Sequence, residues 1–154
     1  MRALYENEEN YYLLAKACSP KEKERLTQAY IDIDNNLENH GLVCVAEGIL
    51  SATTYKAISE LITIPERTTV IDCGCCLGLQ QVFFHDCKRY IGIDMSNSFY
   101  KISDNAEFIQ GDIREVLPTL QIDNNTVGIS VLCGSVWEDI GKVIRSKFNK
   151  LIIV

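Results

Sequence analysis

The fold of this chain is decided by the stretch Thr68-Thr-Val-Ile-Asp-Cys-Gly-Cys-Cys-Leu-Gly78. Residues 68–71 are all β-branched and predict a short buried strand, because branched side chains fit a pleated sheet. The strand runs into Asp72 and then into a turn that holds Gly74 and Gly78. Glycine permits positive φ and close approach of the backbone, so we expect a ligand to lie against this turn.

A second predicted strand, Arg89-Tyr-Ile-Gly-Ile-Asp94, also ends on an acid. Asp94 follows Asp72 by 22 positions and Gly74 by 20. An acid about 20 residues after a glycine turn suits hydrogen bonds to ribose hydroxyl groups. The spacing therefore predicts a ribose contact at the ends of these two strands.

Three segments, in this order, resemble motifs of the class I S-adenosylmethionine-dependent methyltransferases. They are Val70-Ile-Asp-Cys-Gly-Cys-Cys-Leu-Gly78, Tyr90-Ile-Gly-Ile-Asp-Met-Ser96 and Glu107-Phe-Ile-Gln-Gly-Asp-Ile113. The resemblance covers residues 68–154. It implies an α/β fold with a doubly wound parallel sheet, a Rossmann-like αβα sandwich, in a short version that ends after strand five.

The resemblance also implies that S-adenosylmethionine is the cofactor. The turn after strand one would hold its methionine part, the acid after strand two its ribose, and the acid after strand three its adenine. The residue that follows strand four would lie beneath the sulfonium. The cofactor-binding residues implied are Asp72, Cys73, Gly74, Cys76, Gly78, Asp94, Met95, Asp112, Ile113 and Cys133.

Each of the three acids also has a purely structural interpretation. Asp72 and Asp94 can cap the turns that follow them, and Asp112 can be the N-cap of a helix that begins at Ile113. Because three acids each end a strand of one predicted sheet, we prefer a shared binding function.

Cys76 is the plainest departure from the resembled family, which usually has glycine at this position. A Cβ reduces the room for a ligand that approaches the backbone. We therefore expect weak binding of S-adenosylmethionine, which Cys76→Gly would tighten.

The composition is that of one globular domain: 154 residues, 47% hydrophobic and 23% charged. A formal net charge of −6 disfavours nucleic acid as a partner. The N-terminus lacks the apolar run of a secretory signal, and no segment approaches the ~20 apolar residues that cross a bilayer. We therefore expect a cytoplasmic protein that does not bind membranes.

The seven cysteines are an odd number, and we expect reduced thiols that pack as small apolar side chains. Cys73, Cys75, Cys76 and Cys87 can be considered as ligands of a metal ion. No second pair at zinc spacing occurs elsewhere in the chain, so we predict no metal site.

The chain divides into a mainly helical segment, residues 1–65, and the Rossmann-like core, residues 66–154, which together form one domain. Residues 3–18 have a broken amphipathic pattern that predicts a helix. Ser19-Pro-Lys-Glu22 predicts a helix start with a capping box, and the helix should run to about residue 40. Its apolar stripe is predicted to comprise Leu26, Ala29, Tyr30, Ile33 and Leu37.

The rest of this segment is predicted to hold one short element of undecided type and one more helix. Residues 42–46 are a short strand or the opening of a helix, and the pattern does not decide between them. Residues 51–62 predict a helix that ends before Pro65. The side chains expected to face inward are Tyr55, Ile58, Leu61 and Ile62.

In the core, predicted helices alternate with the strands. We expect helices over residues 79–84, 113–120 and 137–148, and strands over residues 126–133 and 150–154. The connection between the second and third strands leaves little room for a helix near residues 98–103. His85 at a helix end is expected to have a structural role.

The chemistry is less defined than the fold. After strand four, Cys133-Gly-Ser-Val-Trp-Glu-Asp139 differs from the Asn/Asp-Pro-Pro-Tyr stretch of enzymes that methylate nucleobase amino groups, so we expect a small-molecule or protein acceptor. No general base, and hence no catalytic residue, identifies itself. Glu138 and Asp139 are candidates, although acids that open a helix commonly interact with its dipole.

Two other functions stay open. One is a non-catalytic relative that binds S-adenosylmethionine weakly or not at all and acts through partners. The other is a nicotinamide-dependent oxidoreductase, which fits less well because the G-x-G-x-x-G spacing is absent and Asp72 precedes the first glycine.

The apolar strand Leu151-Ile-Ile-Val154 should not remain bare at a sheet edge, because exposed edges pair with other chains. We predict that it is covered either by residues 42–46 or by a second copy of the protein, giving a homodimer.

Overall fold

The structure is a computed structural model, and it describes residues 16, 18–36, 52–131 and 138–154. Several predictions lie outside these residues. They concern residues 3–15 and 17, the end of the first helix with Leu37, the element at residues 42–46, and Cys133.

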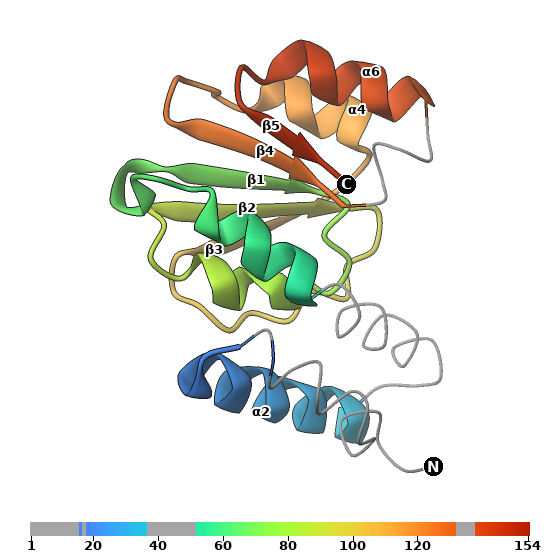
Figure 1. Cartoon of the computed structure of the whole chain (residues 1–154). Coiled ribbons are helices and arrows are strands. Elements are labelled where there is room, and N and C mark those ends of the chain that lie inside the picture. The colour runs from blue at the N-terminus through green and yellow to red at the C-terminus, as the bar shows by residue number, and fades with distance from the viewer. Residues whose placement is uncertain (1–15, 17, 37–51, 132–137) are drawn as a thin grey trace.

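The core is a five-stranded, all-parallel sheet with the order β3-β2-β1-β4-β5 (Figure 1). Its strands are β1 (Thr69–Cys73), β2 (Arg89–Asp94), β3 (Ala106–Gln110), β4 (Thr126–Ser130) and β5 (Leu151–Ile153). The order reverses between β1 and β4, which is the point where ligands bind in open α/β sheets. The predicted α/β fold of Rossmann-like type is thereby confirmed. Many protein families share this fold.

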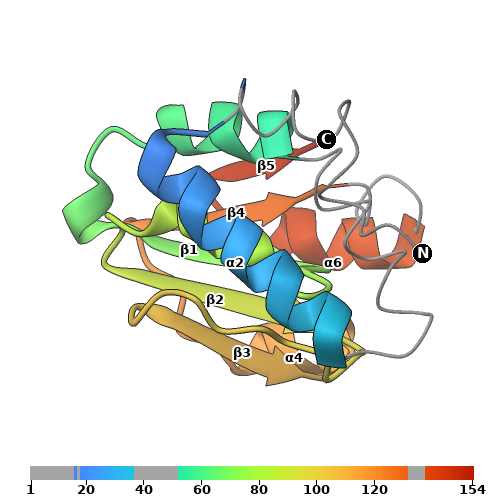
Figure 2. The same cartoon turned by 90° about the horizontal axis from the view of Figure 1, so that it is seen from below.

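Helical elements cover both faces of the sheet, as Figure 2 shows. On one face, α2 (Pro20–Asn36), residues 52–60 and the 3-10 helix η3 (Leu79–Phe84) pack in one hydrophobic cluster. On the other face lie α4 (Ile113–Val116), the 3-10 helix η4 (Leu117–Thr119) and α6 (Glu138–Lys147). The alternation of side chains along β1 feeds both clusters: Val70 packs on the first face and Ile71 on the second.

The start of α2 has the capping box that its sequence predicts. The backbone N–H of Glu22 donates to Ser19 Oγ at 3.3 Å, and the N–H of Ser19 donates to Glu22 Oε2 at 2.7 Å. Glu22 also forms an ion pair with Lys56 at 3.0 Å. This pair links α2 to residues 52–60.

The apolar stripe of α2 is buried as predicted over its described part. Its members there are Leu26, Ala29, Tyr30 and Ile33. Burial of each large apolar side chain contributes about 1.5–3 kcal/mol, so the stripe is the main attachment of α2.

For the next helix, the prediction that Leu61 faces inward is wrong. Tyr55 and Ile58 are buried and Ile62 is half-buried, but Leu61 is 65% exposed. The reason is that the helix ends at residue 60, so Leu61 lies in the turn that leads to the 3-10 helix η2 (Pro65–Arg67).

Three connections of the core are shorter than an ordinary crossover helix. The segment after β1 is the 3-10 helix η3, whereas the sequence predicted an α-helix. Residues 95–105 contain no helix, in line with the limited room expected there. The predicted helix at residues 113–120 is α4 followed by η4, and the change occurs between Val116 and Leu117, just before Pro118.

None of the described helices combines the length and the apolar composition that a membrane-spanning segment requires.

Candidate functional site

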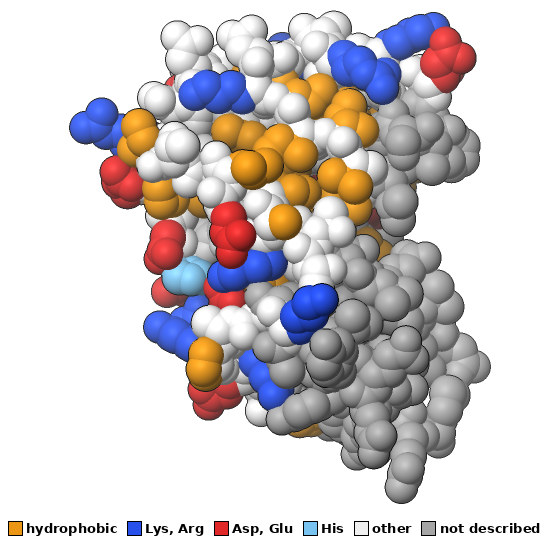
Figure 3. Space-filling model, in the orientation of Figure 1, with side chains coloured by type: hydrophobic (Ala, Val, Ile, Leu, Met, Phe, Trp, Pro, Cys, Tyr) orange, Lys and Arg blue, Asp and Glu red, His pale blue; other side chains and the backbone are white. Residues whose placement is uncertain are grey.

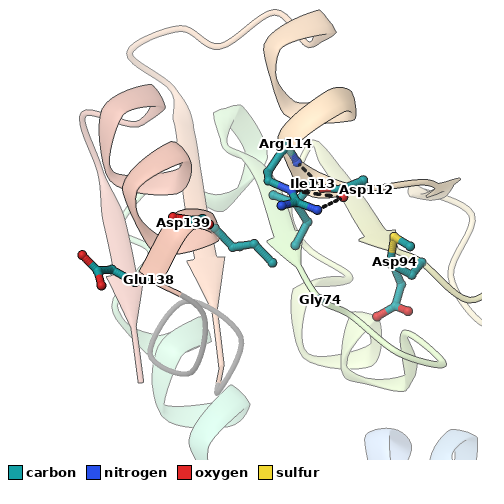
Figure 4. Close-up of a pocket in the computed structure, with 9 residues that line it drawn as sticks. Gly74, Asp94, Asp112, Ile113, Arg114, Glu138 and Asp139 are labelled. Atoms are coloured by element: carbon teal, nitrogen blue, oxygen red, sulfur yellow. Dashed lines mark hydrogen bonds and ion pairs between the residues drawn. The ribbon is translucent and has the colours of Figure 1, made fainter.

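A cavity of about 560 Å³ lies at the carboxyl ends of β1, β2 and β3 and beside the start of α6. Figure 4 shows its lining. The residues are Gly74, Asp94, Met95, Asp112, Ile113, Arg114, Glu138, Asp139 and Ile140. Five of the ten predicted cofactor-binding residues are therefore brought together here: Gly74, Asp94, Met95, Asp112 and Ile113.

Asp94 connects the end of β2 to the glycine turn. Its Oδ2 accepts the backbone N–H of Cys76 at 2.8 Å, and its Oδ1 accepts that of Ser96 at 2.9 Å. The structural interpretation, in which Asp94 caps the turns, is thus correct for this residue. Each oxygen of a carboxylate has two lone pairs, so these bonds orient Asp94 and leave it able to accept hydrogen bonds from a ligand.

Cys76 has a left-handed backbone conformation, with φ of 53°. It is the only non-glycine residue with positive φ in the described part of the chain. Positive φ is costly for a residue with a Cβ and free for glycine. The positive φ of Cys76 therefore has a conformational cost in this chain, and Cys76 itself is not part of the cavity lining.

Asp112 is the N-cap of α4, because its Oδ1 accepts the backbone N–H of Arg114 at 2.8 Å. The Arg114 side chain forms a second connection, with Nη2 2.5 Å from Oδ2 of Asp112. These bonds from Arg114 lower the pKa of the Asp112 carboxyl to about 2. The capping interpretation of Asp112 is thus correct, while its position in the cavity lining leaves a ligand contact possible.

Acidic side chains outnumber basic ones in the cavity lining. Four carboxylates, Asp94, Asp112, Glu138 and Asp139, accompany the single base Arg114. Of these, Asp112 is neutralised by its pair with Arg114, and Glu138 is paired with Lys142 at 2.8 Å. In Figure 4 the Glu138 carboxylate is directed away from Asp94. The local potential is therefore negative and suits a cationic ligand.

Asp72 lies in a different environment from Asp94 although it is the last residue but one of the neighbouring strand. It is fully buried on the α2 face, where its Oδ2 accepts Tyr90 Oη and Gln80 Nε2, both at 2.6 Å. Gln80 also donates to the carbonyl oxygen of Cys75 at 2.9 Å. The network joins β1, β2 and the glycine turn, and it does not border the cavity.

Burial disfavours the charged form of Asp72 and raises the pKa of its carboxyl to about 6, against the effect of the two hydrogen bonds. Among the described residues, its Oδ1 has no hydrogen-bond partner. Asp72 therefore has a structural role, and the pKa of its carboxyl is well above the ordinary value.

Gly78 and Gly92 leave no room for a side chain, because the ring of Phe108 lies beside both. A Cβ on Gly78 would be 2.2 Å from Cε1 of Phe108, and one on Gly92 would be 2.8 Å from Cδ1 of the same ring. The ring stacks on Phe99 at a centroid distance of 4.9 Å. Gly78 was predicted to permit approach of a ligand, but the space beside it is filled by β3.

Cys73 is not part of the cavity lining and is buried in the cluster on the α4 and α6 face. Cys133 lies outside the described residues. Burial raises the pKa of the Cys75 thiol, and it raises the pKa of Cys87 to about 11. In the described ranges, no group of three or more His, Cys, Asp or Glu side chains could hold a metal ion.

Three structural or cavity-lining residues were missed by the sequence analysis. Arg114 and Ile140 line the cavity. Gln81, fully buried, donates to the carbonyl oxygens of Gly78 and Tyr100 at 2.8 Å and accepts the N–H of Ser103 at 2.9 Å. Two adjacent glutamines inside an apolar crossover segment were a signal of buried polar contacts.

No protein-family model matches the chain, and no curated protein matches it. The residues of the cavity and their chemistry are consequently the basis for any functional conclusion.

Proposed function

We propose that this chain binds S-adenosylmethionine in the cavity at the carboxyl edge of the sheet and acts as a methyltransferase on a small-molecule or protein acceptor. The observation that carries the proposal is the position of Asp94. It ends β2, lines the cavity beside Gly74, and is oriented by two backbone N–H groups.

The fit of the ribose rests on the remaining lone pairs of Asp94. A carboxylate that accepts two hydroxyl groups forms charge-assisted hydrogen bonds, which are stronger than neutral ones. Because the backbone already orients Asp94, little side-chain entropy is lost on binding. Met95 follows directly and is 69% exposed, which offers apolar surface to a purine ring.

The charge of the lining supports this ligand over a dinucleotide. S-adenosylmethionine carries a sulfonium, an ammonium group and a carboxylate, so its net charge is positive and an acidic cavity attracts it. The diphosphate of a nicotinamide dinucleotide would be repelled by Asp94 and Asp139 and would find one base, Arg114, already paired with Asp112. The oxidoreductase alternative is therefore less favoured by the electrostatics.

The bound cofactor would supply an activated methyl group, and the protein would contribute mainly orientation. Ile113 and Ile140 would exclude water from one side of the cavity, and Asp94 would hold the ribose. Glu138 is a poor general base because it is exposed and paired with Lys142. Asp139 is the remaining candidate of the two acids considered.

One observation favours the non-catalytic alternative. Phe108 occupies the space beside Gly78, so part of the glycine turn is unavailable to a ligand. A protein that binds the nucleoside weakly and acts through partners would be compatible with a turn closed in this way.

Calorimetry with S-adenosylmethionine, S-adenosylhomocysteine and NAD tests the proposal on the full chain. We expect weak binding of the first two ligands and none of NAD. Binding of NAD with no binding of S-adenosylmethionine would contradict the proposal. Transfer of labelled methyl groups to a metabolite or protein extract then separates a methyltransferase from a non-catalytic binder.

A further inference from the structure

The two outer strands of the sheet differ in how their free edges are protected. β3 carries the exposed side chains Glu107 and Gln110, and Glu107 forms an ion pair with Arg89 at 2.6 Å. Charged side chains on an edge strand discourage pairing with another chain. The β3 edge is therefore protected against association.

The β5 edge has no such protection within the strand. Its residues Leu151, Ile152 and Ile153 are apolar and each is half-buried, and the adjoining Val154 is 50% exposed. In the described part of the chain β5 pairs with β4 alone. Figure 3 shows hydrophobic side chains gathered over β4, β5 and the C-terminus.

The outward hydrogen-bonding groups of β5 can be assigned from its pairing with β4. The N–H of Gly128 donates to the carbonyl of Lys150, and the N–H of Val154 donates to the carbonyl of Ser130. Because alternate residues of a strand point their backbone groups to opposite sides, Leu151 and Ile153 direct theirs outward. These two residues are available to pair with another strand.

The helix beside this edge has charges that match those of an antiparallel copy of itself. α6 begins with Glu138 and Asp139 and ends with Arg145 and Lys147, followed by Lys150. This distribution also complements the helix dipole. A two-fold axis perpendicular to the sheet would bring α6 beside α6 of a second copy in the opposite direction, so that each acidic start meets a basic end.

We propose that the chain forms a homodimer in which β5 pairs antiparallel with β5 of a second copy, giving one continuous ten-stranded sheet. The inference does not depend on the proposed function. The occupant is a second copy because the charges of α6 are self-complementary about such an axis, and a parallel or head-to-tail arrangement would lose that match.

Sedimentation velocity of the full chain tests the proposal across protein concentrations. We expect a species of twice the 17.4 kDa of one chain. Ile153→Pro removes an outward N–H and no bond to β4, and we expect it to weaken dimerisation at least tenfold. The exposed Lys21 on α2 supplies the matched control, Lys21→Glu, which should leave the dimer unchanged.

Charge reversal distinguishes a specific interface from loss of folding. Arg145→Glu should weaken the dimer, and combination with Glu138→Arg should restore it, because the exchanged charges again meet across the axis. A wild-type monomer at all concentrations would overturn the proposal. So would a dimer that neither Ile153→Pro nor Arg145→Glu weakens. Slow amide exchange at Leu151 and Ile153 in a monomer would show that the β5 edge is covered by another segment of the same chain, as the alternative with residues 42–46 requires.

Discussion

Asp72 and Asp94 lie near the carboxyl ends of neighbouring strands of one sheet, yet their environments differ. Asp72 is fully buried among Tyr90 and Gln80, whereas Asp94 lines an open cavity and contacts backbone N–H groups. The comparison shows that an acid at the carboxyl end of a parallel strand is not by itself a ligand contact. Both acids have the strand parity of the α2 face, and Asp72 is in register with Gly92, two residues before Asp94. The position along the strand, and not the face of the sheet, therefore decides between a structural and a binding role.

The largest expected effect concerns Gly78, where the ring of Phe108 fills the space beside the glycine turn. Gly78→Ala should destabilise the protein by about 3 kcal/mol or more, because φ is +74° and the new Cβ would be 2.2 Å from the Phe108 ring. Urea denaturation measures the change. In a Gly78→Ala, Phe108→Leu double variant the total loss should be smaller than the sum of the single losses. Full additivity would show that the ring is not the cause.

The titration of Asp72 should appear in the pH dependence of stability. Its folded-state pKa of about 6 exceeds the ordinary 3.8, so the folded protein binds the proton more tightly. The stability from this group is therefore present below pH 3.8 and is lost as the pH rises to about 6. The total loss is about 3 kcal/mol at about 1.4 kcal/mol per pKa unit.

Asp72→Asn removes this titration while it keeps an acceptor for Tyr90 and Gln80. The difference in unfolding free energy between wild type and variant should change between pH 4 and 6, measured by urea denaturation. Glu107→Gln is the control: Arg89 lowers the pKa of Glu107, so that its stability contribution is lost as the pH falls. A difference that is independent of pH would contradict the interpretation of Asp72.

The proposed ligand contact of Asp94 in the cavity is tested by measuring ligand affinity. Asp94→Ala should weaken binding of S-adenosylmethionine more than tenfold, because charge-assisted hydrogen bonds to the ribose are lost. Asp94→Asn keeps an acceptor for the Cys76 N–H and separates the ligand contact from the support of the turn. Calorimetry with Asp72→Asn should show affinity close to wild type. An equal loss of affinity in Asp94→Ala and Asp72→Asn would contradict the assignment of different roles to the two acids.

The smallest expected effect is that of Cys76→Gly. Glycine adopts φ of 53° without strain, so the variant should stabilise the turn by about 1 kcal/mol and tighten the ligand about fivefold. Cys76→Ala keeps the Cβ and should give no gain in either measurement. If Cys76→Gly and Asp94→Ala both leave affinity unchanged, the turn is not a cofactor site and the non-catalytic alternative replaces the proposal.

The alternation of strands and helices was predictable because it rests on local patterns. Branched residues before Asp72 predicted β1, and Ser19 with Glu22 predicted the start of α2. These signals depend on neighbours in the chain, which the sequence displays directly. The 3-10 helix η3 was not predictable, since its apolar residues fit either helix type and packing on the sheet decided between them.

The sequence by itself determined that Asp72, Asp94 and Asp112 lie at or close to the ends of strands, and that glycines follow β1. Only the tertiary structure decided their surroundings. Tyr90 is 18 positions from Asp72, and the Phe108 ring that fills the space beside Gly78 comes from β3. The physical reason is that the pairing of β1 with β2 and of β2 with β3 brings these side chains onto the same face, and contacts between strands set burial, pKa and room for a ligand.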